Sequence, residues 1–164
     1  MAKRTKAKMH PLISFEEAAG WVDRPAHERP AHALDEKQTL RLVELLESFT
    51  RTPEDCVFAL WEGYGPTSVR YSSMPRVHLY RPCVLFRGPM GAIGSFHFEA
   101  PQGGHEWWVP PNMWWPSDRS WFVASDLDYT STFVGGSREC VDTIQRDPSF
   151  EVFEVGPTDS TFGC

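Results

Sequence analysis

The residues best suited to specific contacts gather in one tryptophan-rich stretch, His105 to Gly136. Five of the seven tryptophans lie there, mostly in the segment WWVPPNMWWP, and Asp118 and Arg119 follow directly. Large rings braced by prolines offer flat apolar surfaces for a sugar, a base or a proline-rich peptide. An adjacent arginine binds carboxylates through paired hydrogen bonds and stacks on rings. The stretch therefore predicts recognition; the alternative is a small aromatic core beneath a loop, with the Asp118–Arg119 pair as its internal anchor.

The candidate binding residues share a position in or beside expected loops. Adjacent tryptophans tend to point in different directions, so we expect at least one ring of each pair to stay outside the core. Acidic and aromatic side chains at the end of the run Cys56–Trp61 complete the set. The full set is Trp107, Trp108, Trp114, Trp115, Asp118, Arg119, Glu62 and Tyr64.

Catalytic and metal-binding patterns are weak by comparison. The chain has no HExxH, no GxSxG and neither of the two glycine-rich nucleotide motifs. Asp126 and Asp128 form a DxD without a glycine-bearing calcium loop, and His78, His97 and His105 lack metal-ligand spacing. We therefore predict no catalytic residue, metal site or cofactor. The alternative is an enzyme or small-ligand binder whose tryptophan-lined pocket uses Glu62, Asp126 or a histidine as its polar group.

Charge is distributed unevenly along the 164 residues, whose net charge is −6. Four of the 16 basic residues lie within the first eight positions. The rest of the chain then has 12 basic against 22 acidic residues, a balance of −10. An acidic body argues against a nucleic-acid groove. Residues 1–11 are expected to form a basic flexible tail, and nucleic-acid contact is predicted, as a second alternative, only through residues 1–8.

The expected location is the cytoplasm. The four cysteines lie far apart and form no CxxC. The basic start leads into no apolar core long enough for a signal peptide, and no apolar run approaches the roughly 18 residues of a membrane helix. We predict free thiols and no membrane association.

Two helices precede the strands in our prediction. A capping box at Ser14 and Glu17 opens a short helix that ends near Val22, and the proline-containing segment 24–32 forms an extended connection. A second capping box at Asp35 and Gln38 opens a helix that ends near Phe49. Apolar residues at helical spacing face the sheet in this second helix: Leu40, Val43, Leu46 and Phe49.

The remaining chain predicts strands and one late helix. Residues 56–61 form a buried strand, and residues 76–87 an edge strand or a strand with a bulge at Pro82. Residues 120–126 pair with 130–134 in a hairpin; both faces of the first strand are apolar, which indicates cover on two sides. Ser137 caps a helix over 138–146, with Val141 and Ile144 buried, and residues 150–155 form a final strand. Residues 94–99 are expected to form a further strand, and residues 105–116 an aromatic loop.

The fold class is α+β: a single domain over residues 12–164 with a largely antiparallel sheet.

Several blocks carry a family resemblance. They are LWEGYG at 60–65, RGP at 87–89, PNMWWP at 111–116, DRSW at 118–121 and TSTFVGGS at 130–137. Over roughly residues 35–160 the chain resembles an uncharacterised family of high-GC Gram-positive bacteria, which implies no activity. In element order and aromatic content it is similar to immunity and interaction proteins, a likeness of fold alone.

The leading functional prediction is a non-enzymatic, immunity-type protein that binds a protein partner. Its tryptophan-rich, acidic surface would place Trp114, Trp115, Asp118 and Arg119 nearest the contact. The sequence has no recognisable catalytic pattern, and its dense cluster of Trp, Arg and Asp residues is typical of the residues that anchor protein interfaces.

Overall fold

The computed structural model describes residues 34–63, 71, 73–99, 106–125, 131–156 and 159. The predicted helix that ends near Val22, its connection and the basic tail lie outside these residues. So do Tyr64, His105, Asp126 and Asp128. No helix among the described residues is long and apolar enough to cross a membrane.

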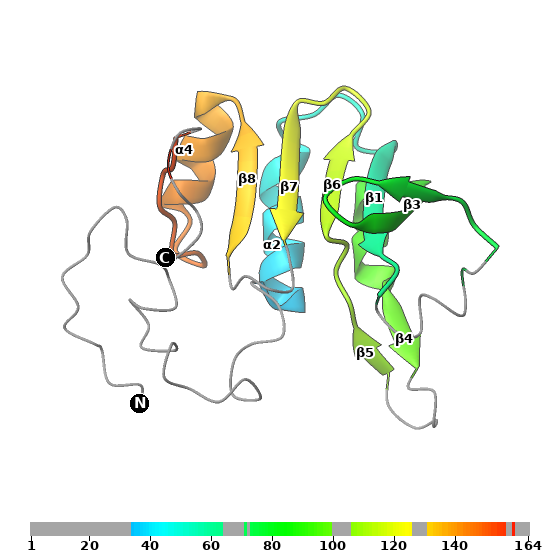
Figure 1. Cartoon of the computed structure of the whole chain (residues 1–164). Helices are drawn as coiled ribbons and strands as arrows, with labels where there is room; N and C mark the ends of the chain where they lie inside the picture. The colour runs from blue at the N-terminus through cyan, green and yellow to red at the C-terminus, as the bar shows by residue number, and fades with distance from the viewer. Residues whose placement is uncertain are drawn as a thin grey trace.

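The described residues build an α+β fold around one six-stranded sheet in which every pairing is antiparallel (Figure 1). The strand order is β2-β3-β1-β6-β7-β8. In chain order the strands are β1 (Cys56–Trp61), β2 (Arg76–His78), β3 (Pro82–Gly88), β6 (Met113–Pro116), β7 (Trp121–Ser125) and β8 (Thr132–Gly136). A separate two-stranded ribbon pairs β4 (His97–Glu99) with β5 (Glu106–Trp108). The α+β, antiparallel prediction is confirmed.

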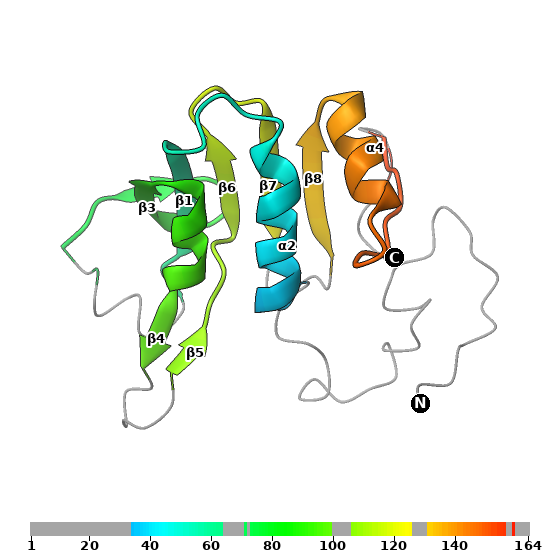
Figure 2. The ribbon, with the colours of Figure 1, turned by 180° about the vertical axis from the view of Figure 1, so that it is seen from behind.

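The helices pack against one side of this sheet. α2 (Glu36–Glu47) and the 3₁₀ helix η2 (Met90–Ser95) lie behind the strands in Figure 1 and in front of them in Figure 2. α4 (Arg138–Arg146) lies alongside β8 and joins the same core. The core contains buried residues from each helix and from the central strands: Leu42, Leu46, Cys56, Phe58, Met90, Ile93, Trp114, Trp121, Val123, Cys140 and Ile144.

α2 begins where the sequence predicts and ends close to it. The Asp35 side chain accepts a hydrogen bond from the Gln38 backbone at 2.7 Å, and the Gln38 side chain accepts one from the Asp35 backbone at 3.2 Å. This reciprocal pair satisfies two amides that a helix start otherwise leaves unpaired. The buried side is rotated from the prediction, because Thr39, Leu42 and Leu46 are buried while Leu40 is 38% exposed.

α4 confirms its predicted bounds and cap. The Ser137 hydroxyl accepts from the Cys140 backbone at 3.2 Å. Cys140 and Ile144 form the buried stripe, and Val141 is half-buried rather than buried. The helix also lies close to β8, since a Cβ added at Gly136 would come within 3.1 Å of the Cys140 sulfur.

Several strand predictions need correction. Residues 76–87 form two strands with a tight connection, and Pro82 begins the second, where a missing N–H is tolerated. The predicted aromatic loop at 105–116 contains the whole of β5 and β6, because its tryptophans pair with β4 and β1. Residues 150–155 form no strand; Phe150 and Val152 instead pack against the core.

Candidate interaction surface

The sheet side opposite the helices is apolar, and none of the described helices covers it (Figures 1 and 2). Side chains alternate between the two faces of a strand, so the strand registers define this side, which we call the open face. Its members are Val57, Ala59, Trp61, Val77, Cys83, Leu85, Arg87, Met113, Trp115, Phe122, Ala124, Phe133 and Gly135. Arg87 is the one charged residue among them. The prediction that β7 is covered on two sides is therefore wrong.

Trp115 and Phe122 form the aromatic end of the open face. Their rings stack with centroids 5.4 Å apart and planes inclined by 27°. Trp115 is half-buried, and Phe122 is 42% exposed. Val57 lies opposite Trp115 in the register. An offset-stacked pair of this kind is rigid and presents one broad apolar surface.

Trp61 forms the other end, where β1 meets the turn between β2 and β3. The Arg81 guanidinium lies 5.0 Å from the Trp61 ring and 5.6 Å from the Tyr80 ring. Tyr80 is 65% exposed. A Cβ at Gly63 would come within 2.0 Å of the Trp61 indole. Gly63 thus allows the ring to fold over the backbone, which explains the glycine two positions after the tryptophan.

Small residues fill the centre of the open face. Ala59 and Cys83 are fully buried between larger neighbours, while Val77 and Phe122 are among the exposed large apolar side chains. Contiguous exposed apolar area with a polar rim marks interaction sites in soluble proteins. The open face can therefore bind an apolar partner surface.

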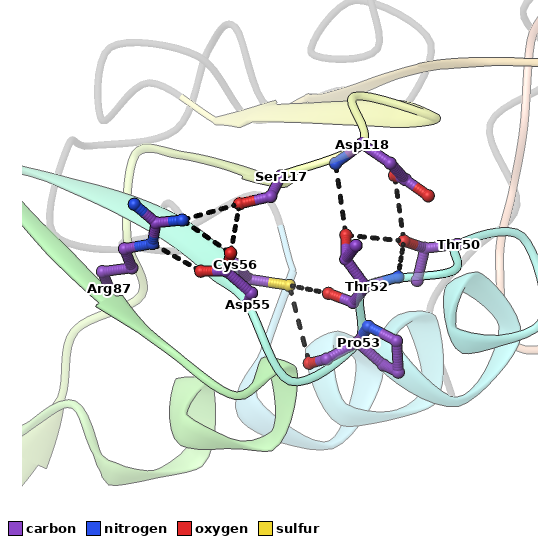
Figure 3. Close-up of polar contacts among 8 residues, drawn as sticks. All are labelled: Thr50, Thr52, Pro53, Asp55, Cys56, Arg87, Ser117 and Asp118. Carbon is purple, nitrogen blue, oxygen red and sulfur yellow. Dashed lines mark hydrogen bonds and ion pairs between the residues drawn. The ribbon is translucent and has the colours of Figure 1, made fainter.

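Arg87 belongs to a polar rim with Asp55 and Ser117 (Figure 3). Its guanidinium donates to the Asp55 carboxylate, with Nη2 2.6 Å from Oδ2, and to the Ser117 hydroxyl at 3.2 Å. The Ser117 hydroxyl in turn donates to Asp55 at 2.7 Å. These bonds, that of Arg87 first, lower the pKa of Asp55 to about 2. The charge of Arg87 is thus balanced by a fixed carboxylate.

Asp118 holds the turn between β6 and β7 against the end of α2 (Figure 3). Burial alone would raise the pKa of its carboxyl, but hydrogen bonds from Arg51, Ser120 and Thr50 outweigh that effect and lower it to about 2. The Arg51 amide donates at 2.8 Å and the Ser120 hydroxyl at 2.8 Å. Asp118 is therefore an internal anchor of the turn, as the alternative interpretation has it, although its partners are not Arg119.

Asn112 sets the start of β6, after two prolines that have no N–H. Its side-chain oxygen accepts from the Trp61 amide at 2.8 Å, and its side-chain nitrogen donates to the Ser125 carbonyl at 3.4 Å. Its backbone bonds to Ala59 and Ser125 as well. One buried amide therefore joins β1 to β7 where β6 begins, and places Met113 and Trp115 on the open face.

The four tryptophans of the predicted set lie in different places in the structure and do not form one surface. Trp114 is 2% exposed and packs edge-on against Trp121 at 5.1 Å, so it belongs to the core. Placing it at a contact surface is wrong. Trp115 lies on the open face. Trp108 is half-buried and its indole N–H donates to the Ile93 carbonyl at 3.3 Å; Trp107 lies in β5, paired with Phe98.

The polar members of the set do not meet in a pocket. Glu62 forms an ion pair with Arg76, with its Oε2 2.7 Å from Nε. Arg119 is exposed and has a positive φ of 54°. The structure brings together instead residues that local sequence reasoning missed, Trp61, Met113 and Phe122. Their signal is that the positions on both faces of β1, β6 and β7 are apolar, so the strands have a second apolar face besides the one that packs against the described helices.

The described carboxyl groups with a shifted pKa all have it lowered by hydrogen-bond donors: Asp55, Asp118, Asp147 and Glu154. Burial, followed by nearby carboxylates, raises the pKa of the Cys56 thiol to about 11, and burial also raises that of Cys140. The described residues contain no group of three or more metal-ligating side chains.

Comparison of the chain with protein-family models, curated proteins and solved structures gives no match.

Proposed function

We propose that this is a non-enzymatic protein-binding module, of immunity type and cytoplasmic, whose open face receives a protein partner. The observation that carries the proposal is the exposed apolar sheet side with the Trp115–Phe122 stack at one end and Trp61 with Tyr80 at the other. Aromatic residues and arginine are enriched in binding hot spots, and their neighbours serve to exclude water. The Arg81 guanidinium over Trp61 fits this pattern.

The contact differs from the one expected from the tryptophan pairs. Trp114 is replaced by Phe122, and Asp118 serves the turn rather than the partner. The acidic body remains relevant, since net charge of one sign favours a cationic partner at long range. Apolar contact then supplies the affinity.

The small-ligand alternative gains no support from these residues. Of the residues it names, Trp114 is in the core and Glu62 pairs with Arg76, while Asp126 and His105 lie outside the described residues. The nucleic-acid alternative concerns residues 1–8, which lie outside the described residues.

The test is a pull-down from the source organism with matched variants. Phe122→Ser removes an aromatic ring from the open face. Phe153→Ser removes a ring of comparable exposure, 53%, from the segment after α4. We expect a protein recovered by the wild type and by Phe153→Ser to be depleted at least about tenfold by Phe122→Ser, which corresponds to about 1.4 kcal/mol. Equal recovery by both variants, with unchanged circular dichroism, would contradict the proposal.

A further inference from the structure

We infer that the outer edge of β8 pairs antiparallel with the same edge of a second copy of this chain, about a two-fold axis through Val134. The contact joins two backbones at the edge of the sheet, so it stands without the proposed function. One consequence rests on that function: the two open faces become continuous, and a partner can contact both.

β8 is the last strand of the sheet, and none of the described strands lies beyond it (Figures 1 and 2). Gly135 and Gly136 are exposed, and a glycine exposes only backbone. α4 packs on the helix-side face of β8 rather than on its edge, because a Cβ added at Gly136 would meet Cys140 and strand side chains point out of the sheet. The backbone at this edge is therefore accessible.

The hydrogen bonds of β7 show which groups of β8 point outward. The Ser125 amide donates to the Asn112 carbonyl at 2.7 Å, so it points toward β6. Along an antiparallel strand these groups alternate between the two neighbours, and β7 therefore bonds to β8 through Phe133 and Gly135 in the register. None of the remaining outward groups is bonded to a described loop, turn or helix. They belong to Thr132, Val134 and Gly136.

This set of outward groups is complementary to itself. A two-fold axis at Val134 places Val134 opposite its own copy, and Thr132 opposite Gly136 of the second copy. Each such pair exchanges two hydrogen bonds, so the three pairs along the strand form about six. The outward N–H and C=O groups of all three residues are then satisfied.

The side chains fit the same arrangement. Phe133 of one copy lies opposite Gly135 of the other, on the open face, where a Cβ added at Gly135 would have nothing within 4 Å. An aromatic ring can cover a glycine on the neighbouring strand. At the axis two β-branched valines face each other, a favourable cross-strand pair. β8 has no charged residue, so the axis brings no like charges together.

The opposite edge of the sheet differs in this respect. β2 has three residues, with Arg76 and His78 at its ends. Short strands and charged side chains protect a sheet edge from pairing. β8 has five residues without charge or proline, and its register with β7 is continuous. Pairing is therefore expected at β8 and not at β2.

The test measures the mass of the full chain by sedimentation as its concentration rises. A five-residue edge is a small interface, so we expect a dimer that forms in the micromolar range or above. Gly135→Lys places a charge opposite Phe133 of the second copy and repels its own copy across the axis. Gly91→Lys is the matched control, because Gly91 is an exposed glycine of η2 that also has nothing within 4 Å of an added Cβ.

We expect wild type and Gly91→Lys to dimerise alike, and Gly135→Lys to have a dissociation constant at least about tenfold higher. Val134→Pro removes an outward N–H that β7 does not use, which an edge strand tolerates, and should weaken the dimer as well. Amide exchange followed by NMR should show Val134 protected in the dimer and unprotected in the monomer, and Phe133 protected in both.

Three results would overturn the inference. The first is a wild type that stays monomeric at every concentration, and the second is a dimer that Gly135→Lys and Val134→Pro leave intact. The third is a Val134 amide already protected in the monomer, which would assign the edge to another segment of the same chain. These measurements need no partner, so their failure is distinguishable from failure of the pull-down.

Discussion

At the start of β6, the side chain of Asn112 makes hydrogen bonds that would otherwise come from the backbone of a neighbouring strand. Pro110 and Pro111 cannot donate to a neighbouring strand, and the Trp61 amide needs an acceptor in a buried position. The Asn112 oxygen supplies it at 2.8 Å. This one residue gives a structural reason for the PNMWWP block that the sequence presents as a recognition motif.

Replacing Asn112 by alanine should therefore destabilise the fold. An unsatisfied buried donor costs about 1–3 kcal/mol, so we expect the free energy of unfolding in urea to fall by about that amount. Gln145→Ala removes an exposed amide from α4 and should change it by less than about 0.5 kcal/mol. Equal effects of the two substitutions would contradict the bridging role of Asn112.

Asp55 and Asp118 make the fold sensitive to acid. Each has a folded pKa of about 2, below the ordinary value of 3.8. A lowered folded pKa means that the charged form stabilises the fold above pH 3.8, and that this stabilisation is lost as the pH falls through 3.8 toward 2. Thermal unfolding midpoints should thus decline across that window.

The variant Asp118→Asn tests how much Asp118 contributes to the decline of the unfolding midpoint at low pH. It removes the titrating carboxyl but keeps an oxygen that can accept from Thr50 or Arg51. We expect a lower midpoint at pH 7 and a shallower decline between pH 4 and pH 2 than in the wild type. A decline as steep as that of the wild type would show that Asp118 does not contribute to it.

At the scale of elements, the turn between β6 and β7 combines a well-bonded start with a strained end. The Arg119 amide donates to the Pro116 carbonyl at 2.9 Å, and Asp118 accepts from the Ser120 amide at 3.1 Å. Arg119 then adopts a left-handed conformation, with φ of 54°. For a residue with a Cβ this conformation costs about 1–2 kcal/mol.

Arg119→Gly should relieve that strain. Glycine adopts positive φ without steric cost but loses more chain entropy on folding. The net result we expect is a gain of up to about 1 kcal/mol, seen as an unfolding midpoint higher by a few degrees. Arg119→Ala removes the same side chain but keeps the Cβ, and should give no gain. A matching rise in Arg119→Ala would attribute the effect to lost charge instead.

A side chain of β7 makes a hydrogen bond to the C-terminal end of α2. The Trp121 indole donates to the Leu46 carbonyl at 3.1 Å. This is one of the last carbonyls of α2, and it also accepts from the Phe49 amide at 3.0 Å. Trp121 is also buried against Trp114. Its predicted structural role is confirmed, and the hydrogen bond adds a specific orientation to it.

At the scale of the whole molecule, one apolar layer lies between sheet and helices and a second apolar surface lies on the open face. Cys56 and Cys140 belong to the inner layer, where burial raises the pKa of both thiols. They can react with a thiol reagent only through opening of the core, because the thiolate is the reactive form.

Thiol reactivity therefore measures the opening of that layer. In a Cys83→Ser/Cys164→Ser background, which excludes the thiol of the open face and the terminal thiol, we expect Ellman's reagent at pH 8 to react at least about 100-fold more slowly in native buffer than in denaturant. Phe122→Ser, which alters only the open face, should leave this slow rate unchanged. Fast reaction of the native protein would contradict a closed inner core.

Much of the secondary structure follows from local sequence. The capping residues of α2 and α4 bond to amides three residues away, so their signals lie within one turn of helix. The hairpin of β7 and β8 is similarly local, and the continuous apolar run Cys56–Trp61 identifies β1. The prediction was wrong where pairing is distant: β6 joins the sheet through β1, more than fifty residues earlier.

The candidate site shows the same division between local and distant information. The sequence by itself determined that aromatic residues dominate residues 105–136, that two capped helices flank the strands and that no familiar catalytic pattern is present. Only the tertiary structure decided which rings are buried, sending Trp114 inward and Trp115 to the open face. The physical reason is that successive side chains of a strand point to opposite faces of the sheet, so the sequence fixes which residues share a face. Whether a helix or another layer packs on that face depends on the tertiary structure of the whole chain.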